Sequence, residues 1–457
     1  MRTRHEIDMS EGKLLPKLLL FFLPLMLTNM LQLTFNTADL IVVGRYGGEH
    51  SLAAVGSNTA LITLIVCVLG GIGTGSNVLV ARYYGAKDVK SLKETISTTV
   101  IIAVLGGILV GFIGVFAAEP ILRLMGTPEE VLPLTVLYLR IYFCGMPVMA
   151  LYNFSSAVLR AVGDTRRPLY YLSLAGVLNV LMNLLFVIVF HMDVAGVAIA
   201  TVLSQCVSCF LTVRCLIRAD TIYRLDTKQM RFSKRQFTQL MRIGLPAGIQ
   251  GSLFSLSNMA IQSSINSFGA VVMAGNSAGA SIESFLFCSQ DSITQAATAS
   301  VSQNMGAGKY DRTKAAVLNC SILVIIVSMT LSCVTMLFRR QLVGIYTSDP
   351  NAITAGATRL LVTGIIYFMN GLMNMMTGAI RGHGYSVLPT AVTLIGVCAF
   401  RIIWVYTFFA WNPTLTVLYI SYPVSWTITA AAQYISYFLI RKKAYIKNDE
   451  HFRSAHT

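Results

Sequence analysis

Twelve long apolar segments, joined by shorter polar stretches, run through nearly all of this 457-residue chain. Each segment is about 20 residues or longer, which is the length an α-helix needs to cross the hydrocarbon core of a bilayer. The segments are continuously apolar and do not alternate with polar residues, which favours helices over the strands of a membrane barrel. Charged residues make up only 12% of the chain. We therefore expect an all-α integral membrane protein.

The expected spans form two groups of six on either side of a polar linker. They lie near residues 14–43, 53–78, 95–117, 133–158, 169–190, 196–217, 239–268, 275–302, 315–337, 355–379, 388–410 and 414–440. This predicts an N-terminal six-helix bundle at residues 14–217 and a C-terminal six-helix bundle at residues 239–440. A tail at residues 1–13, the linker at residues 218–238 and a tail at residues 441–457 complete the predicted division.

Basic residues gather on one side of the expected membrane. Both tails lie on the same side because the number of spans is even, and 28 of the 35 Lys and Arg residues fall there. The positive-inside rule then places both termini in the cytoplasm. We expect the membrane to be a bacterial inner (plasma) membrane. The same distribution accounts for the net charge of +15 through contact with membrane lipids, so we expect no nucleic-acid partner.

Pairs of like residues recur at one offset in the two halves of the chain. Pro24 and Pro246, each near the start of a span, are separated by the same interval as Pro128 and Pro350, which lie in loops. Because each half has six spans, both copies enter the membrane in the same direction. This predicts two bundles related by a parallel internal repeat, an arrangement typical of transporters that work by alternating access.

A carboxylate lies deep inside the first expected span. An aspartate at the centre of a spanning helix costs about 2.5 to 3.5 kcal/mol, so such a residue is a functional candidate by default. Gln32 and Asn36 precede Asp39 by seven and three residues, which puts all three on one helical face. We interpret Gln32 and Asn36 as a supporting polar face. The structural alternative is that the acid is satisfied by helix-end backbone groups or by Arg45.

Three more polar side chains are expected at the depth of Asp39. Asn179 and Asn183 share a face of the fifth span, and Thr201 lies about one turn into the sixth. A set of oxygen ligands suits a hard monovalent cation such as Na⁺, whereas a buried aspartate alone suits a proton. The hypothesis is that these four residues couple transport to H⁺ or Na⁺, with no other cofactor or metal. The alternative is ordinary hydrogen bonding between helices.

The C-terminal bundle offers candidates for a substrate cavity. Glu283 and Asp291 are the acids of its second span, where they could attract cationic compounds. Met373 lies between Asn370 and Asn374 in the fourth span of that bundle, a mixture that suits an adaptable binding surface. The alternative for all five is a structural contact inside the bundle.

No enzyme signature stands out. The glycine-rich GGIGTGSN stretch at residues 70–77 lies within a span and has no Lys-Ser/Thr pair after it, so it is not a phosphate loop. Cys206 and Cys209 have CxxC spacing, but no second pair accompanies them and helix packing explains them. We expect a protein that is not an enzyme.

Several motifs resemble those of the multidrug and toxic compound extrusion (MATE) family. They are LQLTFNTADLIVVGRYGG (31–48), ARYYGAKD (81–88), LRAVGDTRRP (159–168), AGVAIAT (195–201) and SVSQNMGAGKYDR (300–312). The resemblance implies an antiporter that exports small organic and often cationic compounds in exchange for H⁺ or Na⁺. We expect the protein to be a monomer. It maps the family's N-bundle cation site onto Asp39, Asn179, Asn183 and Thr201. Several members have Asp where this chain has Asn183, which weighs against Na⁺ coupling.

Two other functions stay open from the sequence. The first is a flippase for a lipid-linked oligosaccharide or another amphiphile, which should have additional spans or a strongly basic cavity. The second is a membrane sensor that transports nothing, which should carry a folded appendage.

Overall fold

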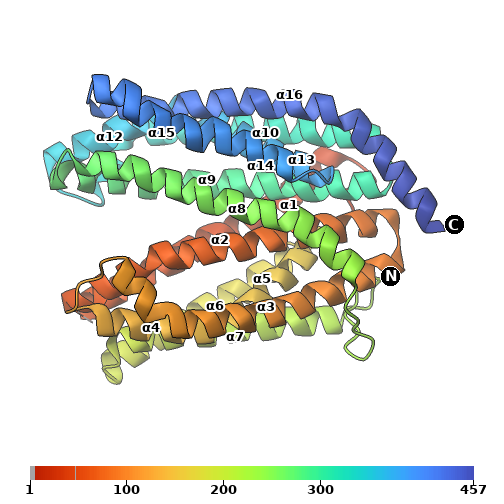
Figure 1. The fold of residues 1–457 in the computed structure, drawn as a ribbon, viewed down its shortest axis with the longest axis horizontal. Coiled ribbons are helices and arrows are strands. Elements are labelled where there is room, and N and C mark those ends of the chain that lie inside the picture. Colours follow the sequence, from red (N-terminus) through yellow and green to blue (C-terminus); the bar gives the residue numbers. More distant parts are fainter. Residues whose placement is uncertain (1–5, 47, 457) are drawn as a thin grey trace. The chain divides into compact units, whose positions relative to one another are not determined.

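The computed structural model describes residues 6–46 and 48–456, with side chains throughout except at residues 48–50, 52, 53, 57, 59, 60, 447, 449 and 451–456. Within these residues the chain forms helices and no strand, and the longest loop between helices is residues 218–233 (Figure 1). The α-helices, and the π-helical turns marked η, are α1 (Leu14–Tyr46), α2 (Gly48–Ala86), α3 (Val89–Leu124), α4 (Leu132–Cys144), α5 (Met146–Ala161), α6 (Arg166–Leu184), η1 (Leu185–Val189), α7 (Asp193–Ile217), α8 (Lys234–Asn266), α9 (Ala270–Gly306), α10 (Tyr310–Leu337), α11 (Arg339–Gly344), α12 (Pro350–Gly364), α13 (Tyr367–Gly382), α14 (Val387–Thr393), η2 (Leu394–Ala399), α15 (Phe400–Trp404), η3 (Val405–Phe409) and α16 (Leu415–His456).

The helices confirm the predicted membrane fold. Nine helices in the described part of the chain are long and apolar enough to cross a bilayer, and two bent pairs raise the number to eleven. The bends are 49° between α4 and α5 and 55° between α12 and α13. The 33-residue helix α8 covers most of the remaining predicted span, but its Ser, Gln and Arg residues make it less apolar than the others.

Contacts divide the chain into two compact units. Unit 1 is built on Leu27–Gly244, and unit 2 on Leu245–Thr457 together with Met9–Met26. The first part of α1, which contains Pro24, therefore belongs to unit 2, and the rest of α1 belongs to unit 1. In unit 2 the backbone N–H of Met9 donates to Oε1 of Gln303 at 2.8 Å, and Nη2 of Arg312 donates to the Met9 carbonyl at 3.0 Å. The cytoplasmic location of the two tails and the linker stays a prediction.

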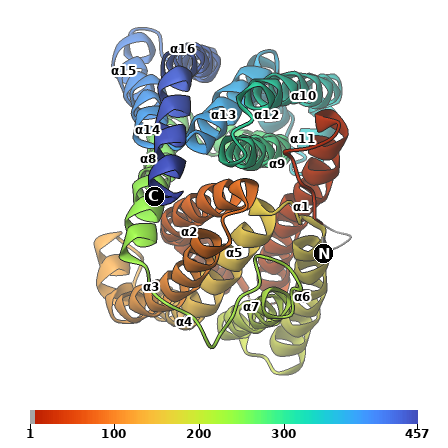
Figure 2. The ribbon, with the colours of Figure 1, turned by 90° about the vertical axis from the view of Figure 1, so that its right-hand side faces the viewer.

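The two units use the same packing scheme. In unit 1, α5 packs against α2, α3 and α7, and Figure 2 shows it among these helices. In unit 2, α13 packs against α9, α10 and α16, which are the counterparts of those helices in the second half of the chain. The turns after α5 and α13 also match, since Gly163 and Gly384 each have a φ of 91°, a left-handed conformation that favours glycine. The repeat expected from the sequence is thus present in the packing.

Candidate cation site

A glycine on α6 lets α1 and α6 approach closely beside Asp39. A Cβ atom added to Gly176 would overlap the ring of Phe35, an approach that no real side chain could accept. Phe35 precedes Asp39 by four residues on α1, and Gly176 precedes Asn179 by three on α6. The close approach therefore brings the Asp39 carboxylate next to the amide-bearing face of α6.

Hydrogen bonds join the four predicted residues into one cluster. Nδ2 of Asn183 donates to Oδ1 of Asp39, and it also lies 3.4 Å from Oδ1 of Asn179. Nδ2 of Asn179 donates to Oγ1 of Thr201 at 3.4 Å, and Oγ1 of Thr201 lies 3.5 Å from Oδ2 of Asp39. Three helices, α1, α6 and α7, thus converge on one carboxylate. The predicted proximity of these residues is present in the structure, while their role in coupling stays a prediction.

A small cavity opens onto this cluster. Its volume is about 50 Å³, and Gln32 and Asn36 line it together with Asp39, Asn179 and Thr201. A space of this size accommodates a water molecule or a monoatomic cation. Organic ligands generally need pockets of roughly 300 Å³ or more. The cavity beside Asp39 therefore has the size of a site for a small ion and is too small for an organic compound.

The side-chain oxygen of Asn183 has no hydrogen-bond partner among the described residues. Asn183 is fully buried, and its Oδ1 atom accepts no hydrogen bond from any described residue. A buried carbonyl oxygen of this kind can ligate a cation, or it can accept a hydrogen bond from a protonated carboxyl group if the amide turns over. The residues present thus fit either of the two predicted coupling ions.

Sequence reasoning missed part of the cavity wall. Ser204 and Gln205 of α7 line it, as does Phe35 of α1. Ser204 and Gln205 follow Thr201 by three and four residues, so helical spacing alone would have placed them on the same face. No pattern in the sequence identifies the contact between Phe35 and Gly176, because it depends on how two helices pack.

Glu283 of α9, one of the residues predicted to line a substrate cavity, is held in an ion pair. Oε2 of Glu283 lies 2.6 Å from Nη2 of Arg359 on α12, and both side chains are largely buried. Oε1 of Glu283 accepts a hydrogen bond from Oγ1 of Thr363 at 2.7 Å. Nη1 of Arg359 reaches Oδ1 of Asn276 at 2.6 Å. Sequence reasoning did not identify Arg359 as the partner, and the structural alternative describes this contact well.

The other C-terminal candidates also have protein partners. Nδ2 of Asn370 donates to Oε1 of Gln290 at 3.0 Å, and Nδ2 of Asn374 lies 3.1 Å from Oδ1 of Asn370. Asp291 accepts a hydrogen bond from Nε2 of Gln295 at 2.6 Å. Met373 is 1% exposed and belongs to an apolar core cluster. A role for these residues in substrate binding stays a prediction.

Unit 2 places an arginine at the position that corresponds to Asn179. Arg401 follows Asn179 by the same interval that separates Pro24 from Pro246, and it is 1% exposed. Its Nε and Nη1 atoms donate to Ser425 and Asn258 at 3.1 and 2.9 Å, and its Cζ lies 4.2 Å from the centre of the Tyr422 ring. No ion pair of Arg401 is found among the described residues, and its Nη2 atom has no hydrogen-bond partner there.

A family model, MatE, matches the chain twice, at residues 24–185 and 246–407. The first match begins at Pro24 and the second at Pro246, and the two matches have the same length. This agreement confirms the internal repeat predicted from the paired prolines.

Related proteins and a solved structure agree with this match. The chain is 29% identical to the "Probable multidrug resistance protein YpnP" of Bacillus subtilis (strain 168), over 88% of this chain and 90% of that protein. It is 26% identical to the "FAD transporter" of Shewanella oneidensis, over 87% of this chain and 88% of that protein. A solved multidrug resistance MATE family transporter of the MOP superfamily, in an outward-facing conformation, has a TM-score of 0.91 at 20% identity, over 97% of this chain and 99% of that one. The relatives are transporters and not enzymes, and this chain belongs to the MATE family of membrane proteins, as its motifs predict.

Proposed function

We propose that this protein is a secondary active antiporter that exports small organic compounds, of the multidrug type, in exchange for a cation bound at Asp39. The observation that carries this proposal is a hydrogen-bonded cluster around one carboxylate of α1. The Asn183 amide and the Thr201 hydroxyl group contact Asp39, and the Asn179 amide bonds to both of them. A carboxylate inside a spanning helix is energetically costly, so such a residue is a functional candidate by default. The multidrug resistance relative supports the class of substrate.

The exchange cycle follows from differential binding. Asp39 takes up a cation from outside, and this favours a state in which the organic compound is released outward. The protein then opens inward, where the cation leaves and a new compound binds. Coupling needs the two ligands to favour different states, because a ligand that binds both states equally shifts nothing.

The contacts of Asp39 favour a proton over Na⁺. One oxygen of Asp39 accepts a hydrogen bond from an amide N–H of Asn183, and the other lies beside the hydroxyl group of Thr201. A sodium ion would need the amides of Asn179 and Asn183 to turn their oxygens toward it. A proton needs only the Asn183 amide to turn over, so that its oxygen accepts the new O–H.

The proposal includes the orientation of the transporter in its membrane and its oligomeric state. We place both termini in the cytoplasm of a bacterial inner membrane, with the chain acting as a monomer surrounded by lipids. The excess of Lys and Arg on one side of the spans supports this orientation.

Transport by purified protein in lipid vesicles tests the proposal. Tetraphenylphosphonium serves as a cationic probe, and proton and sodium gradients are imposed separately. We expect a proton gradient to drive its movement, and Asp39→Asn to abolish that movement while the protein still folds and inserts. Glu130→Gln is the matched control, since it removes an exposed carboxylate from a loop and should leave transport intact. Gradient-driven transport retained by Asp39→Asn would contradict the proposal.

A second candidate substrate class is organic anions. The buried guanidinium of Arg401 has no acidic partner among the described residues, which distinguishes it from Arg359, and one relative bears the name FAD transporter. In the same vesicles, FAD replaces the cationic probe. Transport of FAD that is lost in Arg401→Gln would favour this class, and transport of tetraphenylphosphonium alone would favour organic cations.

A further inference from the structure

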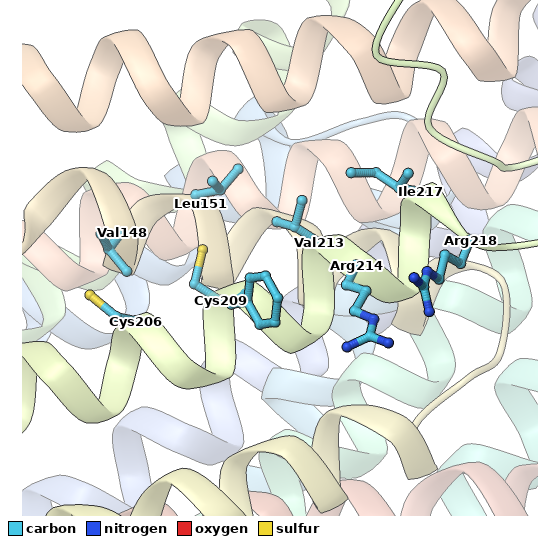
Figure 3. A pocket seen from close by; sticks show the side chains of 9 residues that line it. Val148, Leu151, Cys206, Cys209, Val213, Arg214, Ile217 and Arg218 are labelled. Carbon is cyan, nitrogen blue, oxygen red and sulfur yellow. The ribbon is translucent and has the colours of Figure 1, made fainter.

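An apolar groove runs between α5 and α7 in unit 1. Its volume is about 620 Å³, and its walls include Val148 and Leu151 of α5 and Cys206, Cys209 and Val213 of α7 (Figure 3). Volumes of 300 to about 1,000 Å³ are typical of sites for organic ligands. The groove is therefore more than ten times larger than the cavity beside Asp39, and it lies apart from the residues of that cavity.

One end of the groove is basic. Figure 3 shows Arg214 and Arg218 together at one end, with Val148 and Cys206 toward the other. A second cavity of about 490 Å³ shares Arg214 and Arg218 and adds Arg167. Arg214 and Arg218 thus line both cavities, the apolar groove beside α5 and the basic cavity beside α6.

The two arginines at this end are available to a ligand. Arg214 and Arg218 are exposed, and their side chains make no hydrogen bond or ion pair with any described residue. Arg167 differs, because its Nε atom lies 3.3 Å from Oδ2 of Asp164. The carboxylate of Asp220 also lines the basic cavity. Two unpaired guanidinium groups against this one carboxylate leave a net positive charge.

Position in the membrane identifies the ligand chemistry. Arg214 lies eight residues after Cys206 on α7, roughly 12 Å along the helix. By the predicted orientation, the arginines stand at the cytoplasmic surface and the apolar walls stand at the depth of the lipid chains. Basic pockets between membrane helices on the cytoplasmic side bind anionic lipid headgroups. A free phosphate ion has no apolar group that could pack against the walls of the groove.

We propose that this groove binds an anionic phospholipid of the inner leaflet. One acyl chain lies between α5 and α7 along Leu151, Cys206 and Val213, and the phosphate contacts Arg214 and Arg218. The two thiols of the CxxC pair then serve as small apolar wall atoms of the groove.

Lipid retention by the full-length purified protein tests the site. The protein in mild detergent is incubated with dioleoyl phosphatidylglycerol or dioleoyl phosphatidylcholine, and native mass spectrometry measures the lipid bound. We expect a preference for phosphatidylglycerol. The double variant Arg214→Gln/Arg218→Gln should weaken its binding roughly 30-fold, because each basic side chain at an anionic surface contributes about 1 kcal/mol.

Two further variants distinguish lipid binding in the groove from a general effect of surface charge. Val213→Trp fills the apolar part and keeps both arginines, and we expect it to lower phosphatidylglycerol retention as well. Arg224→Gln/Arg231→Gln removes the same charge from exposed linker positions outside both cavities and should leave retention unchanged. Circular dichroism and gel filtration confirm that each variant is folded.

Three results would overturn the proposal. Equal loss in the linker variant would mean a diffuse surface effect, and full retention in Val213→Trp would exclude the groove. Displacement of the lipid by excess inorganic phosphate alone would mean that the arginines bind a free anion.

Discussion

The two halves of this protein build two different polar sites on corresponding helices of the repeat. Unit 1 has Asp39, Asn179 and Asn183 where unit 2, at the corresponding positions of the repeat, has Ile261, Arg401 and Val405. Asp39 lies beside a cavity of about 50 Å³, whereas Ile261 is 1% exposed in an apolar core cluster. The helix packing was retained in both halves, while the charge at the site was reversed.

This difference indicates which half can exchange a cation. A carboxylate such as Asp39 can load and release a cation as the protein changes state. The guanidinium of Arg401 is a cation fixed to the chain, stacked on Tyr422 and bonded to Ser425. We infer that unit 1 carries the coupling site and that the buried ion pair of Glu283 and Arg359 in unit 2 is structural.

The largest expected effect is on the free energy of unfolding, and it distinguishes Glu283 of unit 2 from Asp39 of unit 1. Glu283→Gln leaves Arg359 buried without its counter-charge, which should lower the free energy of unfolding by about 3–5 kcal/mol. Asp39→Asn should lower it far less, because no cation is paired with Asp39 among the described side chains. Thermal unfolding in detergent, followed by circular dichroism, checks this. Equal losses in the two variants would contradict the division of roles.

The next effect concerns the helix contact that positions Asp39. Gly176→Ala places a methyl group against Phe35, and we expect a loss of about 1–3 kcal/mol in the free energy of unfolding together with slower transport. Gly106→Ala is the control, because a Cβ atom at Gly106 of α3 meets nothing within 4 Å. If both substitutions had the same effect, the close approach of α1 and α6 would not matter to the site.

Much of this arrangement could be predicted from the sequence, for physical reasons. Span length and continuous apolarity are local properties, and the paired prolines at one offset reveal the repeat. The grouping of Asp39 with Asn179, Asn183 and Thr201 needed only helix direction and depth.

Other features depend on packing and could not be predicted. The bend between α4 and α5 has Pro147 in the first turn of α5, but the bend of 55° between α12 and α13 has no proline at its start. The choice of Arg359 as the partner of Glu283 requires knowing which helices are neighbours. The same is true of the contact between Met9 and Gln303, which are 294 residues apart in the chain.

A smaller effect, on the rate of transport, tests the role of the Thr201 hydroxyl group in the cation site. Thr201→Val removes a weak interhelical hydrogen bond, worth about 0.6 kcal/mol on average, and should slow proton-driven transport by about threefold. Thr212→Val is the matched control on the same helix. Both hydroxyl groups donate to the backbone carbonyl four residues earlier, but only that of Thr201 also lies beside Asp39. Initial rates in vesicles at a small proton gradient measure the difference. Equal rates for the two variants would remove Thr201 from the coupling site.

The most direct test of cation exchange at Asp39 is to count protons released when substrate binds. Purified protein in weakly buffered detergent solution, with a pH-sensitive dye, is mixed with saturating tetraphenylphosphonium. The wild type should release about one proton per protein molecule, because the two ligands favour different states. Asp39→Asn should bind the probe and release none. Unchanged proton release from Asp39→Asn would contradict the assignment of coupling to unit 1.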